Sequence, residues 1–95
     1  SYSWLDLTQG VRVFLNVPEI DSIPLGGITV NFRDKSFDVE VLDIARAKRW
    51  VLAVTELPDT VIIGQCKWKV KDGQLSVYLR KWARMGWSKL QMKRG

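Results

Sequence analysis

The sequence predicts an all-β fold, an antiparallel sandwich or barrel of about seven strands. Short segments in which apolar and polar residues alternate recur along the chain, and turn residues separate them. No amphipathic pattern of the length of a helix occurs before residue 82. Many short strands at regular spacing are typical of sandwiches and barrels, whereas alternating strands and helices indicate a parallel sheet.

Each expected strand follows from period-two alternation, because successive side chains of a strand point to opposite faces. Residues 18–27 contain two prolines and two glycines, so we expect a loop there, and residues 43–48 form a second connection. The expected strands cover residues 2–7, 11–17, 28–32, 37–41, 50–55, 66–71 and 74–80, with a short apolar stretch at 61–63.

A hairpin is expected around Asp72-Gly73, because both residues tolerate the positive φ angles of a type I′ turn. This turn pairs Trp68 with Val77 and makes one face of the hairpin wholly apolar. We expect Trp68 and Val77 to be buried opposite each other, and Cys66 to be a buried, unreactive thiol on the same face. The opposite face carries the side chains of Lys67, Lys69, Lys71, Ser76, Tyr78 and Arg80.

The alternation breaks down at residues 83–95, where Trp87 and Leu90 have the spacing of one helical turn. The pair either caps the β domain or anchors a partner. Residues 93–95 are expected to be a frayed end or a linker.

Positive charge is concentrated in the last third of the chain. The net charge is +5 overall, but residues 1–60 carry −3 and residues 61–95 carry +8. This asymmetry indicates an acidic protein, nucleic acid or a membrane surface as partner. No apolar run long enough to span a membrane and no signal peptide are apparent, so we expect no membrane association. The single cysteine fits a reducing compartment, and a cytoplasmic or nuclear location is expected.

The sequence indicates no enzyme, cofactor or metal site. It has no histidine, which excludes histidine-based triads and imidazole zinc sites, and one cysteine cannot build a thiolate cage. Asp38 and Glu40 share a strand face, but they alternate with apolar residues and should therefore face water. A catalytic carboxylate pair requires one member in a shielded pocket.

Three interpretations of the lysine-bearing face follow from its chemistry. Nucleic-acid binding would use Lys67, Lys69, Lys71 and Arg80 for phosphates, with Tyr78 or Phe14 as the stacking ring. Protein docking would set the same cations against acidic residues, with an aromatic anchor. Alternatively, the charges only prevent sheet-to-sheet aggregation.

An ordered set of segments over residues 2–92 resembles the CS domain family of the heat-shock-protein-20-like superfamily. The set comprises Tyr2-Ser3-Trp4, the valine-rich strand ending at Pro18, the segments ITVNF and SFDVEV at 28–32 and 36–41, the hairpin, and Trp87-x-x-Leu90. SFDVEV and the loop with Ile23-Pro24 are most similar to the calcyclin-binding (Siah-interacting) branch, and the YSW start is shared with the nuclear-distribution protein C branch.

The resemblance implies a seven-stranded antiparallel β-sandwich that acts as a non-enzymatic adaptor. Its implied partners are the heat-shock protein 90 chaperone and the Skp and Siah components of ubiquitin ligases. The domain alone would be monomeric, and a longer protein would dimerise through a flanking region.

The resemblance also assigns a contact. In SGT-type co-chaperones the matching strand presents a lysine to the chaperone, and Lys67 occupies that position. This chain departs from the pattern at Lys69, where those proteins carry an acid, and at Asn16, where they carry an aromatic residue. The basic face is thus expected to dock an acidic surface, either that of the chaperone or a different one.

Overall fold

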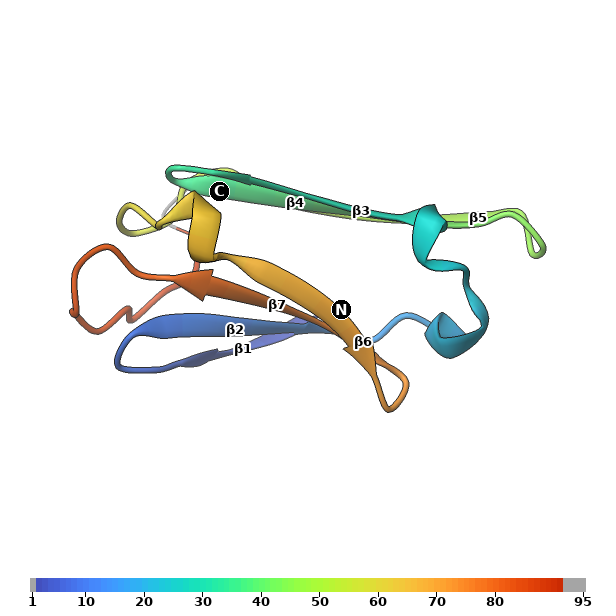
Figure 1. Cartoon of the computed structure of the whole chain (residues 1–95), viewed down its shortest axis with the longest axis horizontal. Helices are drawn as coiled ribbons and strands as arrows, with labels where there is room; N and C mark the ends of the chain where they lie inside the picture. The colour runs from blue at the N-terminus through green and yellow to red at the C-terminus, as the bar shows by residue number, and fades with distance from the viewer. Residues whose placement is uncertain (1, 92–95) are drawn as a thin grey trace.

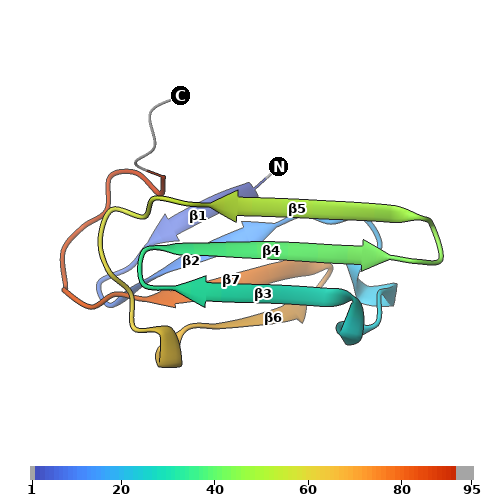
Figure 2. The same ribbon diagram turned by 90° about the horizontal axis from the view of Figure 1, so that it is seen from above.

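The computed structural model describes residues 2–91, which form two antiparallel sheets packed face to face (Figures 1 and 2). One sheet has the order β1-β2-β7-β6 and the other the order β3-β4-β5. The predicted all-β sandwich of seven strands is confirmed. The strands are β1 (Tyr2–Asp6), β2 (Gly10–Leu15), β3 (Ile28–Arg33), β4 (Ser36–Asp43), β5 (Lys48–Val54), β6 (Lys67–Lys71) and β7 (Gln74–Arg80).

The hairpin β6–β7 has the predicted register. Lys67 lies opposite Tyr78, and Trp68 lies opposite Val77. Asp72 and Gly73 have φ angles of 52° and 76°, as a type I′ turn requires. Cys66 is a correction, because it precedes β6 and is only half-buried. The chain enters the strand from a 3₁₀ turn, η3 (Ile63–Gln65), so the ladder cannot extend back to Cys66.

The core lies between the sheets and is deepest under the central strands β2, β4 and β7. Val13 and Val77 face each other there, and both are fully buried. Trp68 is only half-buried, contrary to the prediction. The reason is that β6 is the edge strand of its sheet, so Trp68 has a neighbouring strand on one side only. The other sheet contributes Phe37, Val39, Val41 and Val54 to the buried cluster.

This difference in burial predicts a difference in stability. Phe37→Ala removes a ring that is 1% exposed, so we expect it to lower the free energy of unfolding by about 3–5 kcal/mol. Trp68→Ala should cost less, because part of its ring is already in water. Urea unfolding of both variants measures the two losses. A larger loss for Trp68→Ala would show that the edge strand is more deeply packed than this structure has it.

Two expected connections have more structure than the sequence indicated. The loop at 18–27 contains two 3₁₀ turns, η1 (Ile20–Ser22) and η2 (Leu25–Gly27), and it buries Ile20 and Ile23. The apolar stretch at 61–63 is not a strand. Only Val61 pairs, in an isolated bridge to Lys81, and Ile63 begins η3.

The tail after β7 packs against the sandwich without forming a helical turn. Trp87 and Leu90 are 4% and 3% exposed and belong to the core cluster, as the capping interpretation predicts. Their helical spacing was misleading, because residues 83–91 contain no helix. Residues 93–95, predicted as an end or linker, lie outside the described residues, and the predicted domain bounds of 2–92 stay a prediction.

A buried lysine holds this tail in place. The Lys81 side chain is 1% exposed, and its Nζ lies 2.7 Å from a carboxylate oxygen of Asp6. The same ammonium donates hydrogen bonds to the backbone carbonyls of Leu7, at 2.7 Å, and Met85, at 2.8 Å. Asp6 also accepts a bond from the backbone N–H of Trp87. Lys81 therefore ties the β1–β2 connection to the tail, a role that the sequence did not reveal.

Candidate functional site: the basic face of the four-stranded sheet

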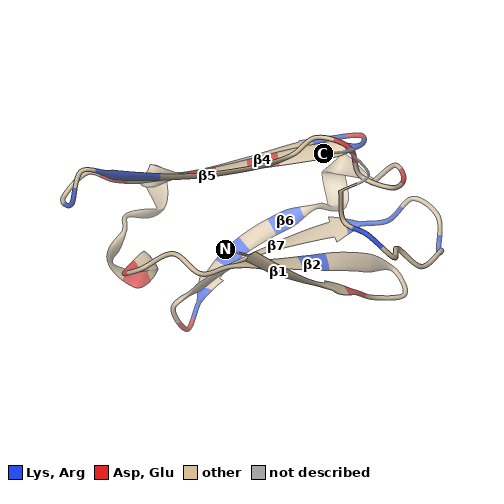
Figure 3. Ribbon diagram, turned by 180° about the vertical axis from the view of Figure 1, so that it is seen from behind, with Lys and Arg blue, Asp and Glu red and all other residues tan. Residues whose placement is uncertain are grey.

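Cations cover the outer side of the four-stranded sheet. Alternation along β2, β6 and β7 points one set of side chains away from the core, and the strand register places them side by side. Figure 3 shows the blue Lys and Arg segments on β2 and β6. We call this surface the basic face; it consists of Arg12, Lys67, Lys69, Lys71, Tyr78 and Arg80.

The cations of the basic face are not neutralised by the protein. Within residues 2–91, none of its five Lys and Arg side chains forms a salt bridge. On the outer side of the other sheet, by contrast, Arg33 pairs with Asp38 and Arg49 with Glu40. The strands that build the basic face place no acidic side chain on it. Unpaired charges of one sign on one face create a field that attracts the opposite charge.

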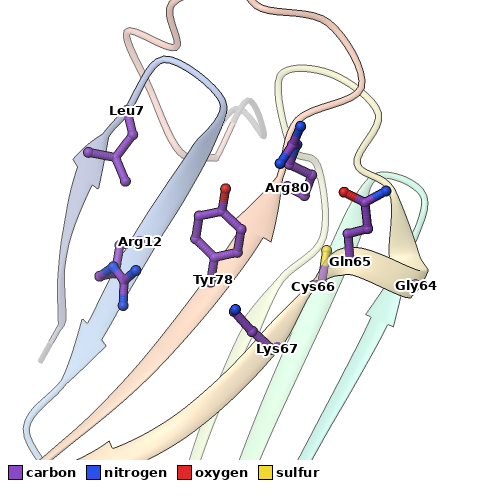
Figure 4. A pocket seen from close by; sticks show the side chains of 8 residues that line it. All are labelled: Leu7, Arg12, Gly64, Gln65, Cys66, Lys67, Tyr78 and Arg80. Carbon is purple, nitrogen blue, oxygen red and sulfur yellow. The ribbon is translucent and has the colours of Figure 1, made fainter.

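A hollow of about 660 Å³ opens on the basic face beside Tyr78. Figure 4 shows the Tyr78 ring standing among Arg12, Lys67 and Arg80, which come from three different strands. Leu7, Gly64, Gln65 and Cys66 complete the lining. A smaller hollow of about 200 Å³ adjoins it, lined by Arg12, Lys67, Trp68, Lys69, Ser76 and Tyr78.

Tyr78 is positioned by neighbours on both adjoining strands. The guanidinium carbon of Arg12 lies 5.5 Å from the ring centroid, and Nζ of Lys67 lies 5.9 Å from it, within cation–π range. The far end of the ring lies over Gly10, where an added Cβ would be 2.5 Å from the ring carbon Cζ. Gly10 thus leaves the space that the ring fills.

This close approach predicts the effect of a single methyl group. Gly10→Ala should displace the Tyr78 ring into the hollow while changing the free energy of unfolding by less than about 1 kcal/mol, because only a side-chain end must move. NMR shifts of the Tyr78 ring protons report the displacement. Gly64→Ala is the matched control, since Gly64 lines the same hollow and its added Cβ would contact nothing. Unchanged ring shifts in Gly10→Ala would contradict this packing.

The structure brings some of the predicted site residues together and leaves others apart. Lys67, Tyr78 and Arg80 line the larger hollow, and Lys69 lines the smaller one. The remaining three predicted contact residues lie outside both hollows. Lys71 lies next to the hairpin turn, and Phe14 is half-buried opposite Ser76. Asn16 lies beyond the end of β2, where its side-chain oxygen accepts a hydrogen bond from Gln74.

Sequence reasoning missed Arg12, Gly10 and Gln65 as parts of this site. Arg12 lies two residues before Phe14, so alternation along this strand puts both side chains on one face. The pairing of β2 with β7, which brings Arg12 next to Tyr78, joins segments more than sixty residues apart, and no local pattern reports it. Gln65 reaches the hollow from η3, a turn that the sequence did not predict.

The pKa values of Asp38 and Cys66 are both shifted away from what catalysis would require. Asp38 accepts hydrogen bonds from Asn31 and Arg33, and the Asn31 bond above all lowers the pKa of Asp38, the opposite of what a general acid requires. Burial raises the pKa of the Cys66 thiol, which disfavours the nucleophilic thiolate. Residues 2–91 contain no cluster of three potential metal ligands. None of their helices is long and apolar enough to cross a membrane.

Comparison with known proteins decides the family. The model of the CS domain family matches residues 1–81. The chain belongs to the CS domain family. It is 25% identical over 81 residues to calcyclin-binding protein from Bos taurus, and this match covers 85% of the chain but only 35% of that relative. CS domains are non-catalytic protein-interaction modules found in co-chaperones, so protein partners are indicated.

Two solved structures share the fold of this CS domain. The CS–b5R domains of human Ncb5or, in the NAD⁺ form, superpose with a TM-score of 0.80 at 22% identity, covering 96% of this chain and 25% of that one. The CS domain of the human KIAA1068 protein gives a TM-score of 0.80 at 18% identity, covering 98% of this chain and 73% of that one. At these identities the likeness establishes the sandwich alone.

Proposed function

We propose that this CS domain docks an acidic surface of a partner protein through its basic face. The observation that carries the proposal is a set of five cations on one sheet face that have no salt-bridge partners among residues 2–91. Three of them, Arg12, Lys67 and Arg80, line the hollow beside Tyr78. Complementary charge steers encounter and fixes the register of docking, and a central aromatic side chain supplies the anchor. Lys71, Phe14 and Asn16 extend the contact toward the hairpin end of the face.

The proposed partners are the heat-shock protein 90 chaperone and the Skp or Siah components of ubiquitin ligases, which makes the domain a co-chaperone or ligase-adaptor module. This proposal rests on the CS family and on the similarity to calcyclin-binding protein. We propose a cytoplasmic or nuclear location on the same grounds, and no enzymatic activity.

Binding of single-stranded nucleic acid is the alternative, and the ring geometry argues against it. A stacking platform needs an aromatic ring with a free face. The Tyr78 ring has Arg12 and Lys67 beside it and Gly10 beneath its end, and Phe14 is half-buried. The two rings that the sequence offered for stacking are therefore already in contact with the protein, Tyr78 with cations over its ring and Phe14 partly covered.

The two functions are separated by a binding experiment at two salt concentrations. Wild-type protein and the variant Lys67→Glu/Lys69→Glu are each mixed with the ATPase domain of heat-shock protein 90, the Skp subunit and a labelled oligothymidylate. Protein docking predicts that wild type binds one protein partner and that the variant does not. Oligothymidylate binding to wild type that weakens steeply with salt, without binding to either protein, would favour nucleic acid instead.

A further inference from the structure

Trp82 is the most exposed of the five tryptophans. Its side chain is 69% exposed, whereas Trp87 is 4% exposed and the other three pack at least partly against the core. A large apolar ring left in water contributes little to folding. Tryptophan is also the residue type most enriched among the energetic centres of protein interfaces.

Trp82 continues the row of outward side chains that forms the basic face. Tyr78 and Arg80 point outward from β7, and the next residue, Lys81, points inward and is buried. The ladder extends beyond β7, because Lys81 bridges to Val61 and the Trp82 N–H donates a 3.0 Å hydrogen bond to the carbonyl of Thr60. Alternation therefore places Trp82 on the same side as Arg80.

The buried Lys81 also fixes the position of the backbone that carries the Trp82 ring. Lys81 is held by Asp6 and by two backbone carbonyls, so the backbone that carries Trp82 is anchored at its preceding residue. An anchored position loses less conformational entropy when a partner binds. The family model matches residues 1–81, and Trp82 follows directly after the matched segment.

We propose that the partner segment bound by the basic face is extended and acidic, and that it carries a bulky apolar residue that packs on Trp82. This inference rests on the proposed function and specifies the partner's chemistry. The cations around Tyr78 select the acidic part. Tyr78 and Trp82 are separated by roughly 13 Å along an extended chain, so the apolar residue lies about four positions from the acidic residues, before or after them according to the direction in which the segment binds.

Two labelled synthetic peptides test the inference by fluorescence anisotropy at low ionic strength. The first has a phenylalanine, three serines, three glutamates, three serines and a second phenylalanine, so that it fits in either direction, and the second has serine in place of both phenylalanines. Wild type should bind the first about tenfold more tightly, equivalent to about 1.4 kcal/mol. Trp82→Ser should reduce binding of the first peptide to the level of the second. The control is Ile44→Ser, which removes an apolar side chain that is 86% exposed on the β4–β5 connection and should change neither affinity.

The outcomes separate this inference from the proposed function. Equal binding of the two peptides to wild type, with both affinities lost in Lys67→Glu/Lys69→Glu, would overturn the role of Trp82 and support the basic face. Binding of the first peptide that survives Trp82→Ser would overturn it as well. Failure of wild type to bind either peptide, or equal binding by wild type and the charge-reversed variant, would contradict both proposals.

Discussion

Lys67→Glu combined with Lys69→Glu should weaken binding of the acidic partner at least tenfold, or about 1.4 kcal/mol. The two lysines line the two adjoining hollows of the basic face, and reversing them places negative charge against the partner's acidic residues. The loss should appear mainly in the association rate and should shrink as salt rises, because exposed charges are screened. Surface plasmon resonance at two salt concentrations measures both effects.

A matched charge reversal on the other sheet is the control for this result. Lys35→Glu with Lys48→Glu changes the net charge by the same amount, and both lysines are exposed on the β3–β4–β5 sheet and its turns. We expect this control to bind almost as wild type does. An equal loss of affinity in both double variants would show that net charge, and not the basic face, governs binding.

Lys81→Met should lower the free energy of unfolding by about 2–4 kcal/mol. Methionine keeps the length of the side chain but leaves the carbonyls of Leu7 and Met85 without their donor and removes the counterion of Asp6. Urea unfolding measures the loss. Lys89→Met, at an exposed tail position, should change stability by less than about 0.5 kcal/mol. A loss below about 1 kcal/mol in Lys81→Met would contradict the anchoring role.

The contact between Lys81 and Asp6 also makes the stability of the domain depend on pH. The hydrogen bond from Lys81 is the largest of the causes that lower the pKa of Asp6 from its ordinary value of 3.8. A carboxyl group whose pKa is lower in the folded state contributes its full stabilisation above the ordinary pKa and loses it as pH falls through the folded-state pKa. Wild type should therefore lose stability below about pH 4 more steeply than Asp6→Asn. Parallel pH profiles of the two proteins would contradict this contribution.

Local sequence patterns predicted the strands of this fold, but they did not report how strands that are distant in the sequence pair. The hairpin register followed from one turn and period-two alternation, and both are confirmed by Lys67 opposite Tyr78 and by the positive φ angles of Asp72 and Gly73. The burial of Trp68 was overestimated, because alternation reports which face a side chain takes but not whether its strand lies at the sheet edge.

The candidate site was predicted in part for the same reason. The cations of β6 and β7 belong to one hairpin, so the sequence places them together. Arg12 and Gly10 contact Tyr78 only because β2 pairs with β7. In the sequence, nothing distinguishes Lys81 from a surface lysine, because its contacts with Asp6, Leu7 and Met85 are formed by the tertiary structure. Trp87 and Leu90 had helical spacing, yet tertiary packing buries both on an irregular segment.

The most direct test of the basic face is a two-dimensional NMR titration of the labelled domain with the ATPase domain of heat-shock protein 90, and then with the Skp subunit. We predict that one of these partners shifts the amide signals of Lys67, Lys69, Tyr78 and Arg80, while the outer face of the β3–β4–β5 sheet is unchanged. Shifts confined to that other sheet, or no shifts with either partner at high concentration, would contradict docking through the basic face.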